Sequence, residues 1–152
     1  LTVFKQVMFY FKLNLRVRNF DHDSGDGLWP GTRMLNFRLF KKINNVQKIR
    51  NFKVKKYGWW RFDKPRLNII NYGGWHFRFF GSSKNLKHEL ENRSIGRGES
   101  ILSTYSESDI NNIIKNRLPF TTEEERYEVY PLSKMPDFVK LNKERYRDSL
   151  II

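Results

Sequence analysis

The sequence predicts an α/β fold in which a mixed sheet is flanked by helices. Three observations predict it: several segments alternate apolar and polar residues, other segments carry apolar residues at helical spacing, and the chain contains no alanine. Aromatic residues make up 16% of the chain and hydrophobic residues 39%. Core volume must therefore come from large aromatic and branched side chains, which suit the pleated surface of a sheet. At 152 residues, we expect one domain over residues 1–152.

Strands are expected where polar and apolar side chains alternate, and helices where apolar residues recur every three or four positions. Clusters of Asp, Ser, Gly and Pro predict loops. In chain order, the expected elements are a long strand over 2–17, a loop over 22–31, a strand over 32–39, a basic helix within 41–57, short strands over 67–71 and 74–80, helices over 84–93 and 107–118, a strand over 127–130 and a last helix over 137–147.

Serine residues identify the beginnings of two helices. Ser82 or Ser83 is the expected N-cap of the helix over 84–93, and Ser106 or Ser108 that of the next helix. The glycines around Arg97 predict a mobile linker between them. The acidic run over 123–125 is interpreted as a solvated turn.

The segment over 71–81, NYGGWHFRFFG, is the most informative part of the chain. Gly73 and Gly74 precede the strand, and glycine permits a close backbone approach that other residues do not. Alternate side chains of a strand share a face, which gives two sets: Trp75, Phe77 and Phe79, and opposite them His76, Arg78 and Phe80. An imidazole and a guanidinium on one face, beside a glycine bend, predict an anion-facing surface. The structural alternative is a buried strand after a turn, with a hydrogen-bonded core or edge histidine.

This segment resembles the Gly-Trp-His signature strand of glycosyltransferase family 17, the β-1,4-mannosyl-glycoprotein N-acetylglucosaminyltransferase family and its microbial relatives. Other segments are similar to the family in the same order along the chain. They are the aromatic strand ending in Leu-Asn over 9–15, the Trp-x-Gly-Thr-Arg turn over 29–34, a short helix ending in Arg over 46–50, the helix over 81–94, and the closing strand and helix over 129–132, 136–139 and 142–146.

The resemblance implies the C-terminal half of a GT-A-like nucleotide-sugar fold. It also implies inverting transfer of N-acetylglucosamine from a UDP-sugar donor to a hydroxyl of a glycan or glycoprotein acceptor. A carboxylate base would deprotonate the acceptor, and a divalent metal, Mn²⁺ or Mg²⁺, or cationic groups would stabilise the leaving diphosphate. The family resemblance places such a protein in the Golgi, whereas the lack of cysteine, signal and anchor favours the cytoplasm.

Carried over residue by residue, the resemblance assigns roles to eight positions. His76 would contact the diphosphate or the metal, and Glu99 would be the catalytic base. Trp75 would stack on a sugar face, and Arg33 or Arg78 would neutralise phosphate charge. Trp29, Gly73 and Gly74 complete the substrate-binding set. The structural alternatives are a core role for Trp75 and a surface cation at Arg33.

The chain departs from the family at two places. Family members carry an Asp-x-Asp element, which binds the metal and the donor diphosphate, before the aromatic strand, but this chain begins at Leu1 at that strand. We therefore expect an incomplete domain, either a fragment or the product of a truncated gene. The Asp-His-Asp letters over 21–23 are interpreted as a turn. The segment over 94–99 lacks the family's histidine and retains only Glu99. An inactive remnant is therefore a further hypothesis.

Net charge supports an alternative function without catalysis. The chain carries +13, and residues 1–100 hold 21 Lys and Arg against 7 Asp and Glu. Such a surface attracts polyanions, so a nucleic-acid or polyanion-binding module is the alternative. Phosphate contacts and stacking platforms would come from Lys41, Lys42, Lys48, Arg50, Lys53, Lys55, Lys56, Trp59 and Trp60. The structural alternative is a solvated basic face.

Other classes of site are excluded or lack support in the sequence. The chain has no cysteine, so it has no disulfide and no thiolate metal site. The histidines His22, His76 and His88 stand too far apart in sequence for a recognisable ligand motif. No stretch approaches the roughly 20 apolar residues of a membrane span.

Overall fold

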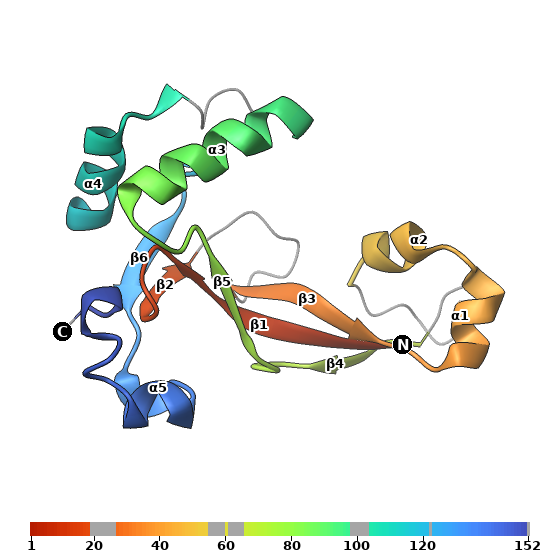
Figure 1. Cartoon of the computed structure of the whole chain (residues 1–152). Helices are drawn as coiled ribbons and strands as arrows, with labels where there is room; N and C mark the ends of the chain where they lie inside the picture. Colours follow the sequence, from red (N-terminus) through yellow and green to blue (C-terminus); the bar gives the residue numbers. More distant parts are fainter. Residues whose placement is uncertain (19–26, 55–59, 61–65, 98–103, 122, 152) are drawn as a thin grey trace. The chain divides into compact units, whose positions relative to one another are not determined.

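The computed structural model describes residues 1–18, 27–54, 60, 66–97, 104–121 and 123–151. Among these residues the chain is a mixed α/β protein with a six-stranded, mainly antiparallel sheet and five α-helices, as the sequence predicted at this level (Figure 1). The chain forms two compact units. Unit 1 comprises residues 1–7 and 22–76, and unit 2 comprises residues 8–21 and 77–152.

The first part of β1 (Thr2–Tyr10) pairs with two strands in unit 1, and a third strand pairs farther along it. They are β3 (Leu28–Met34), which is antiparallel to β1, β4 (Asn68–Ile70), which is parallel to it, and β5 (Trp75–Arg78). In the β3 register, Val3 lies opposite Arg33 and Gln6 lies opposite Trp29. The backbone N–H of Val7 donates to the carbonyl of Gly74 at 3.0 Å, immediately before β5. The predicted strands over 67–71 and 74–80 are therefore present in shorter form.

Two short helices follow β3, and the predicted strand over 32–39 was wrong beyond Met34. The helices are α1 (Phe37–Ile43) and α2 (Val46–Asn51). Asn36 caps α1 because its side chain accepts from the Leu39 backbone N–H at 2.8 Å. A second asparagine, Asn44, ends α1 in the left-handed conformation with φ 44°. The expected loop over 22–31 was also wrong in part, because β3 begins at Leu28.

Unit 2 contains a hairpin where the sequence predicted one long strand over 2–17. β1 ends at Tyr10, and β2 (Leu15–Arg18) returns antiparallel to it with Phe9 opposite Arg16. The turn between them includes Phe11 at φ 64°, although its side chain is buried. Alternation of apolar residues continues through this turn, so periodicity did not reveal the reversal. β6 (Arg126–Val129) pairs antiparallel with β2.

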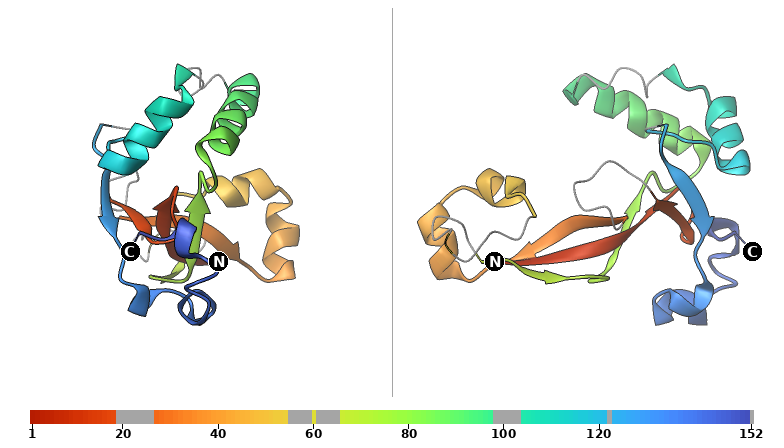
Figure 2. Two further views of the ribbon diagram at one scale, coloured as in Figure 1. Left: turned by 60° about the vertical axis from the view of Figure 1, so that its left-hand side comes forward. Right: turned by 180° about the vertical axis from the view of Figure 1, so that it is seen from behind.

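Helices α3 (Ser83–Arg97) and α4 (Glu107–Asn116) pack together in unit 2 (Figure 2). Ser82 caps α3 by accepting from the Asn85 N–H at 3.3 Å, which confirms one of the two predicted caps. α3 continues through Arg97, where a linker was expected. The last helix, α5 (Asp137–Leu141), ends earlier than the expected residue 147, and turns and a short 3-10 helix follow it.

Most of the buried apolar side chains that the structure describes belong to unit 2. Unit 1 buries four of them: Val3, Val7, Leu28 and Ile49. Unit 2 buries fifteen: Met8, Phe9, Tyr10, Phe11, Leu15, Val17, Phe79, Leu86, Leu90, Ile110, Ile113, Phe120, Met135, Val139 and Leu150. Ile110 and Ile113 are the inward side of α4, as its predicted apolar stripe requires. The larger core therefore belongs to unit 2.

Candidate functional site

Trp29 and His76 come together in unit 1 although they are 47 positions apart in the sequence. Their ring centroids are 3.9 Å apart, and the ring planes make an angle of 33°. Trp29 is on β3 and His76 on β5, and both strands pair with β1. Strand pairing thus joins two of the motifs that the sequence presents separately, the Trp-Pro-Gly-Thr-Arg turn and the Gly-Gly-Trp-His segment.

The glycines of these two motifs lie against side chains of β1. A Cβ at Gly31 would overlap the Trp29 indole and Oε1 of Gln6, and a Cβ at Gly74 would lie 3.1 Å from Nε2 of Gln6. Gly74 also has φ +147°, which L-amino acids rarely adopt. A Cβ at Gly73 would lie 2.8 Å from Cδ1 of Phe4. The close approach predicted at this glycine pair is therefore an approach to Phe4 and Gln6.

Gln6 connects the glycine pair to β3. Its Nε2 donates to Oγ1 of Thr32 at 3.2 Å, one residue after Gly31. Sequence reasoning assigned no role to Gln6, because a polar residue in an alternating strand is expected simply to face away from the core. In the structure the Gln6 side chain contacts both glycine motifs, Gly31 on β3 and Gly74 immediately before β5.

Trp75 and His76 differ in exposure, as neighbouring residues of a strand should. The Trp75 side chain is 42% exposed, so it does not belong to the core. His76 is half-buried beside Trp29. The strand β5 therefore presents an accessible indole from Trp75 on one face and, on the other face, an imidazole in contact with a second indole.

Arg33 has a local structural partner. Its Nη1 donates to the backbone carbonyl of Ile49, which connects β3 to α2 within unit 1. Burial lowers the pKa of Arg33 below its ordinary value, because desolvation disfavours the charged form. A guanidinium titrates so high that the side chain remains charged at neutral pH.

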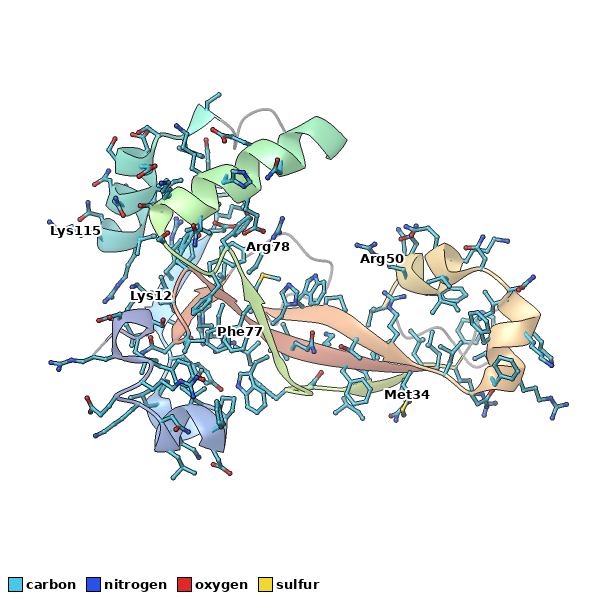
Figure 3. The ribbon with its side chains drawn as sticks, in the orientation of Figure 1. Lys12, Met34, Arg50, Phe77, Arg78 and Lys115 are labelled. Atoms are coloured by element: carbon cyan, nitrogen blue, oxygen red, sulfur yellow. The ribbon has the colours of Figure 1, made fainter. Side chains whose placement is uncertain are left out.

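Arg78 follows His76 by two residues and belongs to unit 2, where its neighbours are aromatic (Figure 3). Its guanidinium carbon lies 4.4 Å from the ring centroid of Phe79 and 6.0 Å from that of Tyr10. Phe77, labelled beside it, stacks on Phe9 with centroids 5.3 Å apart. The Arg78 carbonyl accepts from the Phe11 N–H at 3.3 Å, which fastens the end of β5 to the hairpin turn.

Glu125 is a buried, hydrogen-bonded carboxylate that the sequence did not reveal. The run over 123–125 was predicted to be a solvated turn, and this was wrong for Glu125, whose exposure is 0%. Its carboxylate accepts from the backbone N–H groups of Phe120 and Thr121, each at 3.0 Å, and from the Tyr127 hydroxyl at 2.8 Å. The Thr121 hydroxyl donates to the other oxygen. One signal was available: Glu125 and Tyr127 are two positions apart at the beginning of a strand, which places them on one face.

Two tyrosines around this carboxylate have raised pKa values. Burial raises the pKa of Tyr127, and the negative charge of Glu125 raises it further. Burial also raises the pKa of Tyr10, although the positive charge of Arg78 acts in the opposite direction. Both phenols are therefore protonated donors at neutral pH. The rings of Tyr10 and Tyr127 lie 6.2 Å apart, centroid to centroid.

The remaining predicted site residues have no structural description. Glu99, the Asp-His-Asp turn over 21–23, and Lys55, Lys56 and Trp59 of the predicted polyanion-binding set lie outside the described residues. In the part of the chain that is described, no group of three or more His, Cys, Asp or Glu side chains could hold a metal ion. No helix in that part is sufficiently long and apolar to span a bilayer. No family model matches the chain, and comparison with curated proteins and with solved structures found no match.

Proposed function

We propose that the chain is a glycosyltransferase-like protein that transfers N-acetylglucosamine from a UDP-sugar to a glycan hydroxyl. The contact between Trp29 and His76 is the observation that carries the proposal. It joins two motifs by which the sequence resembles glycosyltransferase family 17, and it does so in one compact unit. Motifs distant in sequence that meet around a histidine form the kind of constellation on which a binding site is built.

The side chains of unit 1 support distinct roles in substrate binding. The exposed indole of Trp75 offers an apolar face to a sugar ring, and His76 offers an imidazole nitrogen to a diphosphate oxygen. Trp29 would hold the imidazole in position. Gly73 and Gly74 allow the backbone to pass close to β1, because a side chain at either position would meet Phe4 or Gln6.

In the proposed reaction, the acceptor oxygen bonds to the anomeric carbon while the bond from that carbon to the diphosphate oxygen breaks. UDP leaves, and the acceptor proton passes to a carboxylate base, the role assigned to Glu99 by resemblance. Cationic groups stabilise the departing diphosphate. A divalent metal would supply the same stabilisation, but the described residues offer no suitable donor set, so the proposal assigns no residue to it.

The proposal is tested by titration calorimetry of the full chain with UDP-N-acetylglucosamine, with and without Mn²⁺, and by assay of UDP release with a mannose-containing N-glycan as acceptor. The His76→Ala variant should bind the donor about tenfold or more weakly, because a hydrogen bond to a charged group contributes roughly 1.5–3 kcal/mol. UDP release should fall accordingly.

The matched control is His88→Ala, which makes the same change at an exposed position of α3 in unit 2. Its donor affinity should equal that of the wild type. Absence of donor binding by the wild-type chain under both conditions would overturn the proposal, as would equal losses in the two histidine variants.

A further inference from the structure

We propose that the exposed surface of α1 and α2 binds single-stranded nucleic acid, with lysine and arginine side chains contacting phosphates and exposed aromatic rings stacking on bases. This inference goes beyond sugar transfer and uses other residues of unit 1. It rests on the charge of the surface, the arrangement of α1 and the exposure of its aromatic ring.

The charge of this region has one sign. Residues 27–54 contain seven Lys and Arg and no Asp or Glu, and unit 1 as a whole has 13 Lys and Arg against 3 Asp, a net of +10. The cations of the two helices are exposed: Arg38, Lys41, Lys42, Lys48 and Arg50. Lys53, just after α2, is exposed as well. With no carboxylate in the described part of unit 1 to neutralise them, these side chains suit a phosphate backbone.

The cations of α1 lie on one side of the helix. At 100° per residue, Phe37, Lys41, Arg38 and Lys42 occupy one continuous arc, and all four are exposed. Leu39, Phe40 and Ile43 occupy the opposite arc and are half-buried. The helix therefore presents three cations and one aromatic ring together to solvent.

The ring of Phe37 is suited to base stacking. Its side chain is 67% exposed, and the Lys41 ammonium lies 5.0 Å from its centroid. A ring and a cation side by side match a nucleotide, whose base and phosphate are neighbours. Trp60, also in unit 1, is 64% exposed. Exposed bases are the distinguishing feature of single strands, so stacking favours these over duplexes.

An anionic bilayer is the competing partner, since Met34 and Val46 are also exposed. Interfacial helices, however, bury a broad apolar face. The exposed arc of α1 offers only one apolar side chain against three cations. The balance of charge and apolar surface on this arc therefore favours nucleic acid.

Fluorescence anisotropy of labelled (dT)20, with (U)20 and a 20-base-pair duplex for comparison, tests the inference on the full chain at several salt concentrations. The variant R38Q/K41Q/K42Q should lose about 100-fold in affinity at low salt. The slope of log K against log salt should become less steep by about 2, since each phosphate contact contributes about 0.7 for single strands. Phe37→Ala should weaken binding while leaving the salt slope unchanged.

The matched control, K143Q/R145Q/R147Q, removes the same charge from exposed positions of unit 2. It should retain the affinity and salt slope of the wild type. Equal losses in the two triple variants would overturn the inference, because net charge alone would then explain binding. Stronger binding of the duplex, or binding of phosphatidylserine vesicles without binding of oligonucleotides, would also overturn it. None of these outcomes depends on UDP-sugar binding.

Discussion

Glu125 is a buried residue in an acidic run, over 123–125, that the sequence predicts to lie on the surface. The residue lies beside Glu123 and Glu124, both exposed, yet its own carboxylate is sealed from solvent. Four donors satisfy that carboxylate: two backbone N–H groups, a threonine hydroxyl and a tyrosine hydroxyl. A buried charge is tolerated only when it is hydrogen-bonded in this way. Glu125 therefore holds the segment before β6 against the aromatic core of unit 2.

Glu125→Gln should lower the free energy of unfolding by about 3 kcal/mol, because an amide nitrogen would face donors that now meet a carboxylate oxygen. Urea denaturation followed by circular dichroism measures the change. Glu124→Gln, which removes a charge from the adjacent exposed residue, is the control and should leave stability within about 0.5 kcal/mol of the wild type. Similar stabilities for the two variants would show that the Glu125 carboxylate is not needed as an acceptor.

Helix ends in this chain are specified by short polar side chains. Asn36 and Asn45 cap α1 and α2, and Ser106 forms a capping box with Asp109 at α4. Asp109 accepts from the Ser106 hydroxyl at 2.6 Å and from the Ser106 backbone N–H at 2.8 Å. These bonds hold the pKa of Asp109 below its ordinary value, the side-chain bond being the larger cause. The caps decide where these helices begin, since helical periodicity gives only approximate ends.

Ser106→Ala should destabilise the protein by about 1 kcal/mol at pH 7 through loss of the cap. A carboxyl whose folded pKa is lowered adds stability above its unfolded pKa of about 3.9, and that contribution is lost as pH falls through the folded value. The difference between wild type and variant should therefore shrink below about pH 4. Urea titrations across this range measure it, with Ser133→Ala at an exposed serine as control. A difference that is constant with pH would contradict the role of Asp109.

The two compact units carry unequal shares of the core. Among the described residues, unit 1 buries four apolar side chains and unit 2 fifteen. Unit 1 also has the greater charge excess, and self-repulsion opposes compaction. Less burial means less hydrophobic stabilisation, so unit 1 is expected to be the less stable part. Both the proposed sugar site and the proposed nucleic-acid surface belong to this unit.

Urea unfolding should therefore give different midpoints with two probes. All four tryptophans lie in the residue ranges of unit 1, so indole fluorescence reports on that unit. The longer helices, α3 and α4, belong to unit 2 and dominate far-UV circular dichroism. Fluorescence should change at lower urea than ellipticity. Ile110→Ala, in the core of unit 2, should shift the ellipticity curve and leave the fluorescence curve in place. Coincident curves in the wild type would mean one cooperative unit.

Local patterns were sufficient for the elements whose signals are short in range. The cap at Ser106, the apolar stripe of α4 and the strands on either side of the glycine pair all follow from residues within a few positions of one another. Propensity, capping and periodicity act over such short distances, so the local sequence specifies these elements. The mixed α/β class followed for the same reason.

Tertiary structure decided the rest. The partner of Gln6 lies in a segment that meets it only when the chain folds. The hairpin at Phe11 and the hydrogen bonds of Glu125 join residues within seven positions of one another, but no residue type there predicts the turn or the burial. The alternation of apolar and polar residues continues across the hairpin turn, and an acidic run has the same sequence whether its glutamates are exposed or buried. The contact between Trp29 and His76 belongs to this second group, because strand register, which no local pattern of the chain specifies, brought the two rings together.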